Sequence, residues 1–157
     1  MRVAPFFISF VLCLFVQFPV EGWAEFKVID IALAQTVKNR EPVGLFSPAA
    51  YCEKDKNNRP DIPVIDSLSF NQVYQVYLWS RIAASTEGKI RFTWRYQEEE
   101  DWKIMAKIDL AIRPSSGYRL WSSKSLYPGT FIGHWMVVIA PSDTPNEILC
   151  IARFTVQ

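Results

Sequence analysis

The sequence is poor in the residues that most often bind metals or act as nucleophiles. His134 is its only histidine, and none of its three cysteines forms a Cys-x-x-Cys spacing. A zinc site or a catalytic thiol needs several such partners, so we expect no metal, no cofactor and no cysteine-based chemistry. The Gly-x-Ser-x-Gly turn that carries the serine of many hydrolases is also missing.

An excess of charge of either sign is lacking as well. The formal net charge is +1 at pH 7, and residues of both signs are scattered along the chain. Binding to nucleic acid or to an anionic membrane surface normally requires a concentration of basic residues, so we expect neither partner. Half of the residues are hydrophobic and 15% are aromatic, which indicates a folded domain and not a disordered chain.

Long apolar runs are absent except at the N-terminus. Such a run follows Arg2, and the small residues Gly22 and Ala24 stand at the −3 and −1 positions of a cut after Ala24. This pattern predicts a secretory signal peptide over residues 1–24 and a periplasmic or secreted domain over 25–157. The run falls short of the roughly 20 residues that span a bilayer. An uncleaved anchor is therefore the less favoured alternative, and no stable membrane span is expected after cleavage.

Two cysteines remain after such a cleavage, Cys52 and Cys150. An even number of cysteines in an exported protein permits one disulfide bond between them. Burial as two free thiols is the alternative, and the residues alone leave both possibilities open.

Alternation of apolar and polar residues dominates the rest of the sequence. The segment KIRFTWRY, residues 89–96, has apolar side chains at every second position, and so has the segment 102–112. This period of two is typical of β-strands with one buried face. Further strands are expected at 130–140 and 147–156, and less regular ones at 26–34 and 72–82. The residues expected to share a buried face are Ile90, Phe92, Trp94 and Tyr96 in the first segment, Trp102, Ile104, Ala106, Ile108, Leu110 and Ile112 in the second, and Phe131, Gly133, Trp135, Val137 and Ile139 in the third.

Turn-forming segments separate these strands at spacings of about 8–12 residues, and we find no long helical pattern and no internal repeat. The sequence therefore predicts one all-β domain, an antiparallel β-sandwich of the immunoglobulin-like kind. One connection, residues 47–70, is much longer than the others and contains three prolines. A connection of this length in a compact domain is usually functional or mobile.

Candidate recognition residues stand where aromatic rings alternate with polar or charged side chains. In the segment YRLWSSK, Trp121 shares a strand face with Arg119 and Ser123. An apolar ring beside hydrogen-bonding groups suits a sugar or a protein partner, whereas the alternative is that these rings only cover the sheet. The candidate binding residues are Arg119, Trp121, Ser123 and Lys124 on this segment and Tyr77, Trp79 and Arg81 on an earlier one.

Catalytic alternatives are weaker. Ser122 or Ser123 with His134 and Asp109 would supply the residue types of a hydrolase triad, but one isolated histidine is little support. The acidic run at 98–101 could form a calcium or acid–base site, although it falls at an expected hairpin tip, where carboxylates are normally solvated.

Four segments occur in a characteristic order: VKNREPVG, RFTWRY, YRLWSSKSL and GHWMVVI. This order resembles the bacterial family called domain of unknown function 2914 (DUF2914). The likeness runs from about Ile29 to Val156, and its most specific part is the segment 119–124 followed by Gly133 and Trp135. The connection that contains Cys52 departs from the family pattern. The resemblance implies an exported or membrane-associated bacterial β domain without known catalytic activity, and it assigns no catalytic residue.

Taken together, these observations predict an exported binding module and not an enzyme. The expected partner is another protein of the cell envelope. A glycan of the envelope or of the extracellular space is the alternative, and hydrolysis is a third and least favoured function.

Overall fold

The computed structural model describes residues 26–46, 53–54, 60–61, 64–68, 75–127 and 131–157. Within these ranges the regular elements are all strands, and no helix long and apolar enough to cross a membrane occurs there. The strands are β1 (Phe26–Lys38), β2 (Glu41–Leu45), β3 (Glu53–Lys54), β4 (Pro60–Asp61), β5 (Val64–Leu68), β6 (Gln75–Ala84), β7 (Gly88–Glu98), β8 (Asp101–Ile112), β9 (Ser115–Ser125), β10 (Gly133–Pro141) and β11 (Cys150–Val156). The expected signal peptide and its cleavage site lie outside the described residues.

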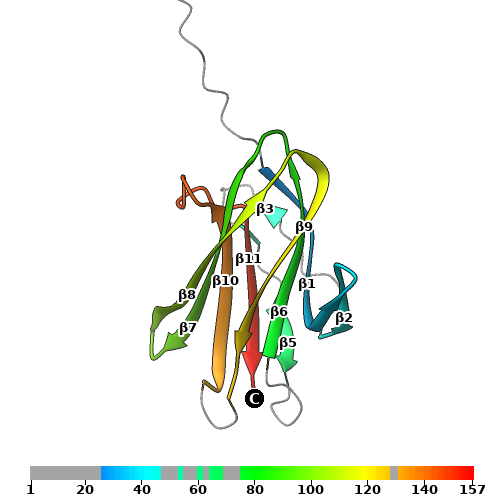
Figure 1. Cartoon of the computed structure of the whole chain (residues 1–157). Coiled ribbons are helices and arrows are strands. Elements are labelled where there is room, and N and C mark those ends of the chain that lie inside the picture. Colours follow the sequence, from blue (N-terminus) through cyan, green and yellow to red (C-terminus); the bar gives the residue numbers. More distant parts are fainter. Residues whose placement is uncertain (1–25, 47–52, 55–59, 62–63, 69–74, 128–130) are drawn as a thin grey trace, which may run out of the picture.

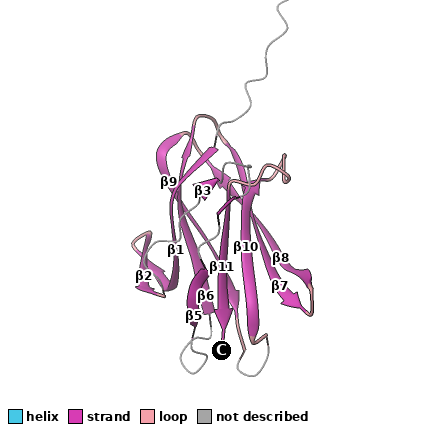
Figure 2. Ribbon diagram, turned by 180° about the vertical axis from the view of Figure 1, so that it is seen from behind, coloured by secondary structure: helices cyan, strands magenta, loops and turns pink. Residues whose placement is uncertain are grey.

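Two sheets form the domain (Figures 1 and 2). One has the strand order β2-β1-β6-β9, and the other has the order β5-β11-β10-β7-β8, while β3 and β4 form a separate short ribbon. All pairs are antiparallel except β5 with β11. The expected all-β antiparallel sandwich is confirmed.

The pairing scheme is that of an immunoglobulin-like sandwich. In that fold, strand B pairs with strand E in one sheet, and strand F lies between strands C and G in the other. Here β6 pairs with β9, and β10 lies between β7 and β11. Strand β8 extends the second sheet beyond β7, as the C′ strand does in variable-type domains.

The main core fills the space between the sheets and is rich in aromatic rings. Trp94, Trp135 and Phe154 are fully buried there, with Phe154 stacked on Trp135 at 6.2 Å and edge-on to Trp94 at 6.3 Å between ring centroids. The Trp94 indole N–H donates to the hydroxyl of Ser122 at 2.9 Å, which ties β7 to β9 in the opposite sheet. The buried positions expected for Trp94 and Trp135 are confirmed.

One expected face is wrong, because β8 contains a bulge. The register against β7 shifts at Met105, so that Met105 and Ala106 both pack against the main core. On the N-terminal side of this extra residue, the side chains expected to face the core face outward instead. Ala106, Ile108, Leu110 and Ile112 face the core as expected, whereas Trp102 and Ile104 lie on the outer face of the sheet.

The connection at 47–70 is not a simple loop. Most of it lies outside the described residues, but it contributes β5, which adds a parallel strand to β11 at the edge of the second sheet. The alternation of residues within one segment does not predict a parallel edge strand such as β5, because its pairing depends on a distant part of the chain.

Arg91 and Asp109 form an ion pair between β7 and β8. The two residues are directly opposite each other, and the guanidinium donates to both carboxylate oxygens of Asp109, each at 2.7 Å. These hydrogen bonds lower the pKa of the Asp109 carboxyl below its ordinary value of 3.8.

This lowered pKa predicts a small pH-dependent stabilisation. Because the unfolded chain takes up the proton first, the stabilisation is fully present above the ordinary carboxyl pKa and is lost as the pH falls through the lowered value. Asp109→Asn should therefore lower the Tm slightly at neutral pH, since the pair is at the surface, and the difference from the wild type should vanish in acid. A difference that stays constant during a melting series from neutral to strongly acidic pH would contradict this assignment.

Candidate functional site

Six of the seven predicted recognition residues gather on the outer face of the sheet β2-β1-β6-β9. We call this surface the hairpin face, because the β1–β2 hairpin lies on it. Trp79 is directly opposite Trp121 across β6 and β9. Tyr77 is likewise opposite Ser123, and Arg81 is opposite Arg119. Lys124 does not share this surface, because its register position is opposite Val76, whose side chain faces the core.

The β1–β2 hairpin folds back over this face and covers part of it. Arg40, in the hairpin turn, accepts a hydrogen bond from the Trp79 indole N–H through its backbone oxygen at 2.8 Å. Glu41, the next residue, forms a 2.8 Å ion pair with Arg119. The Arg40 guanidinium also lies 5.5 Å from the ring centroid of Tyr118. These contacts agree with the sequence pattern at 37–44 in which a basic residue precedes Glu and Pro, and they give that segment a structural role.

The hairpin turn requires unusual backbone angles. Asn39 and Arg40 have φ values of 51° and 66°, the left-handed conformation that two-residue hairpin turns adopt to match the twist of their strands. Asn tolerates this conformation better than most residues, whereas Arg does not. The contacts of Arg40 with Trp79 and Tyr118 offset this local cost.

Trp79 and Trp121 consequently differ in accessibility although they are neighbours. Trp79 is only 4% exposed beneath the hairpin, while Trp121 is 37% exposed. The strip of open coplanar rings that a glycan-binding sheet would need is therefore not formed by this pair. Of these two rings, it is Trp121 that offers an open surface to a partner.

Polar contacts and apolar side chains surround Trp121. Gln75 donates to the Ser123 hydroxyl at 2.8 Å and accepts from the Tyr77 hydroxyl at 3.1 Å. Arg81 pairs with Asp30 at 3.7 Å. Three further apolar side chains of β1 and β2 are exposed on this sheet, namely Ile29, Val43 and Leu45. The face thus combines one exposed indole and scattered aliphatic side chains with hydrogen-bonding groups that are already oriented.

The residues of the hydrolase alternative do not assemble. Ser122 is buried, and its hydroxyl is engaged with Trp94. Ser123 belongs to the hairpin face, whereas His134 is exposed on the outer side of the other sheet. Asp109 is held by Arg91.

The acidic run at 98–101 forms the exposed tip of the β7–β8 hairpin. Glu98 is paired with Lys103. No group of three or more His, Cys, Asp or Glu side chains placed to hold a metal ion occurs in the part of the chain that the structure describes.

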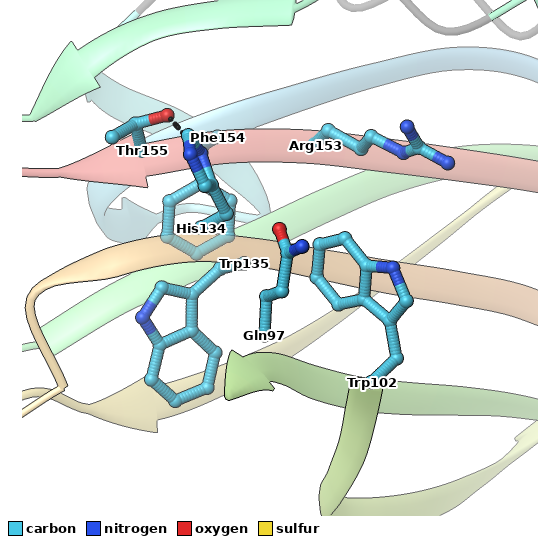
Figure 3. A pocket seen from close by; sticks show the side chains of 7 residues that line it. All are labelled: Gln97, Trp102, His134, Trp135, Arg153, Phe154 and Thr155. Atoms are coloured by element: carbon cyan, nitrogen blue, oxygen red, sulfur yellow. Dashed lines mark hydrogen bonds between the residues drawn. The ribbon is translucent and has the colours of Figure 1, made fainter. Parts of the chain in front are cut away.

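A pocket that was not expected from the sequence lies on the outer face of the second sheet (Figure 3). It has a volume of about 260 Å³ and crosses β8, β7, β10 and β11. The residues lining it are Gln97, Trp102, His134, Trp135, Arg153, Phe154 and Thr155. We call this surface the pocket face.

Comparison with known proteins supports the family that the motifs resemble. A model of the family described as a protein of unknown function (DUF2914) matches residues 87–156. The matched region runs from the start of β7 to the end of β11, so it contains the whole pocket but not the β1–β2 hairpin or β6, and it is shorter than the likeness inferred from motifs. No curated protein matches the chain significantly. Over residues 87–156, this chain is therefore similar to the DUF2914 family.

Proposed function

We propose that the protein is an exported, non-catalytic binding module that recognises another protein of the cell envelope through its hairpin face. The observation that carries this proposal is the exposed ring of Trp121, set among the oriented polar side chains of β6 and β9. Exposed aromatic residues with a polar surrounding are typical centres of protein interfaces.

A protein partner is favoured over a glycan on this face for two reasons. Trp79 is buried beneath the hairpin, so two open rings are not available to stack on successive sugars. The exposed Ile29, Val43 and Leu45 add aliphatic surface, which suits a protein better than a polyhydroxylated chain.

Export and the disulfide are part of the same proposal. Export is supported by the signal-peptide pattern of residues 1–24. Pairing of Cys150 with Cys52 is supported by the full burial of Cys150 in β11 and by Cys52 being the other cysteine left after cleavage. Cys52 itself lies outside the described residues.

Replacement of Trp121 tests the proposed face. Trp121→Ala should weaken capture of the partner from envelope extract by about tenfold or more, because a central aromatic residue of an interface contributes at least 1.4 kcal/mol. The measurement is a quantitative pulldown with tagged wild-type and variant protein, followed by titration of the captured protein.

The matched control is Ile104→Ala. Ile104 is also an exposed apolar residue, but it lies on the outer side of the other sheet, so its loss should leave capture unchanged. Equal capture by the wild type and Trp121→Ala would refute the hairpin face as the binding surface.

A further inference from the structure

We infer that the pocket face is a second binding site and that it takes an uncharged saccharide ring. The pocket is on the opposite side of the sandwich from the hairpin face, so this inference does not depend on the proposed protein partner.

The pocket is built by one row of side chains that crosses four strands. Gln97 is directly opposite Trp102, and His134 is directly opposite Thr155. Because β7 and β10 pair with Trp135 opposite Tyr96, the position of Gln97 adjoins that of His134. Figure 3 shows the Gln97 amide standing between the Trp102 ring and His134.

Trp102 forms a fixed wall of this pocket. It packs on a small apolar cluster of the outer face, made of Met136, Val138 and Ile151. The Arg153 guanidinium lies 5.7 Å from the centroid of its ring. An indole held in this way presents ring surface to a ligand at little cost in side-chain entropy.

The remaining lining residues supply hydrogen-bonding groups. The His134 Nδ1 and the Thr155 hydroxyl are 3.0 Å apart, which fixes the imidazole and leaves Nε2 without a partner among the described residues. Gln97 donates to the backbone oxygen of Glu99 at 3.3 Å, so its amide oxygen remains an acceptor. Arg153 adds several donors beside the Trp102 ring.

The charges around the pocket favour a ligand without net charge. Two positive side chains lie on this face. Arg153 lines the pocket, and Arg95 is opposite Met136 on the neighbouring strand. The exposed hairpin tip at 99–101 places three carboxylates at the end of the same two strands, while Glu98 and Lys103 pair with each other. Charges of both signs around the pocket partly offset one another, so neither an anion nor a cation is strongly favoured.

A saccharide matches this lining better than a peptide. A pyranose ring has an apolar face that can lie on an indole, and its hydroxyl groups both donate and accept hydrogen bonds, as Gln97, His134 and Arg153 require. The volume of about 260 Å³ is just below the usual range for small-molecule pockets and suits a ligand of one or two rings. An extended peptide would instead be expected at a sheet edge, where backbone groups are unpaired.

The test is a titration followed by the indole N–H resonances of the purified protein in two-dimensional ¹H–¹⁵N NMR. The probes are chitotetraose, cellotetraose and maltotetraose, with tetragalacturonate as a charged comparator and an alternating serine–alanine hexapeptide as a peptide comparator. At least one uncharged tetrasaccharide should shift the Trp102 resonance with millimolar affinity, while the Trp121 resonance stays in place.

Variants of the pocket residues assign the binding. Trp102→Ala should weaken the saccharide by about tenfold, and Gln97→Ala should weaken it several-fold with no loss of folding, because Gln97 is not in the core. Trp121→Ala is the matched control and should bind the saccharide as the wild type does.

Four results would overturn the inference. The first is that none of the uncharged tetrasaccharides shifts Trp102. The second is that tetragalacturonate or the hexapeptide binds at this site more tightly than they do. The third is that Gln97→Ala binds unchanged while folded. Loss of saccharide binding in Trp121→Ala would transfer the site to the hairpin face and would also overturn the inference.

Discussion

Replacing Trp135 with alanine is expected to lower the free energy of unfolding by about 3–5 kcal/mol, the usual cost of truncating a buried tryptophan. Its ring is fully buried between the sheets, stacked on Phe154 and 5.2 Å from the Tyr96 ring centroid. Its indole N–H donates to the backbone oxygen of Phe131 at 2.9 Å, and that bond is lost as well. Urea unfolding followed by circular dichroism measures the change.

The same substitution at Trp121 provides the control for this prediction. Trp121 is 37% exposed on the hairpin face and is directly opposite Trp79 on the neighbouring strand. Its truncation should cost less than about 1 kcal/mol, the value of one cross-strand pair. Equal and large losses in both variants would mean that Trp121 is part of the scaffold, and the proposed interface would then lack its central residue.

The strands were predictable from sequence where the alternation of apolar and polar residues within one strand reflects its two faces. Residues 89–96 alternate strictly, because β7 has one face in the core and one in solvent, and the side-chain period of a strand is two. Strand β10 is buried on both faces, with Trp135 in the main core and Met136 in the outer cluster. Its continuous apolar run at 135–140 follows from this, and its strand assignment rested on the flanking turns as much as on alternation.

The pocket was not predictable, because it depends on an irregularity of pairing. Simple alternation puts Trp102 on the same face as Ile108, whereas the bulge at Met105 turns it to the outer face. A bulge arises from how two strands fit together, and no residue between 101 and 112 marks it in the way that a glycine would. A signal in the sequence is the run of three adjacent apolar residues, Ile104, Met105 and Ala106, which interrupts the alternation.

Most members of the hairpin face were predictable, with Lys124 as the exception, but their exposure was not. Period two correctly placed Tyr77, Trp79 and Arg81 together, and strand pairing then brought them opposite Arg119, Trp121 and Ser123. The burial of Trp79 comes from Arg40, which is 39 residues away in the chain. Burial of a side chain by a residue distant in the chain depends on tertiary packing, and the residue pattern of a single strand does not predict it.

Disruption of the proposed bridge between Cys52 and Cys150 is the second change from which we expect a large effect. The bridge would close a loop of nearly one hundred residues, and in the chain-entropy model its loss costs about 4 kcal/mol. Cys150 is fully buried in β11, directly opposite Ile139 of β10, so the bond would fasten the long connection to the centre of the second sheet. Cys52→Ser should therefore lower the Tm by several degrees or more, whereas Cys52→Ser in the presence of reductant should show no further loss.

The pairing and the energetic effect can be tested separately. Peptide mapping of protein purified without reductant should recover Cys52 and Cys150 in one linked fragment, and alkylation without reductant should modify neither. Removing the bond at Cys52 leaves the core intact, since Cys150 remains in place as a small buried side chain. Reductant should lower the Tm of the wild type to that of Cys52→Ser, because both treatments release the same constraint on the unfolded chain. If reductant leaves the wild-type Tm unchanged while both thiols become reactive, the bond contributes nothing to stability. The connection would then be held by β5 and its pairing with β11 alone.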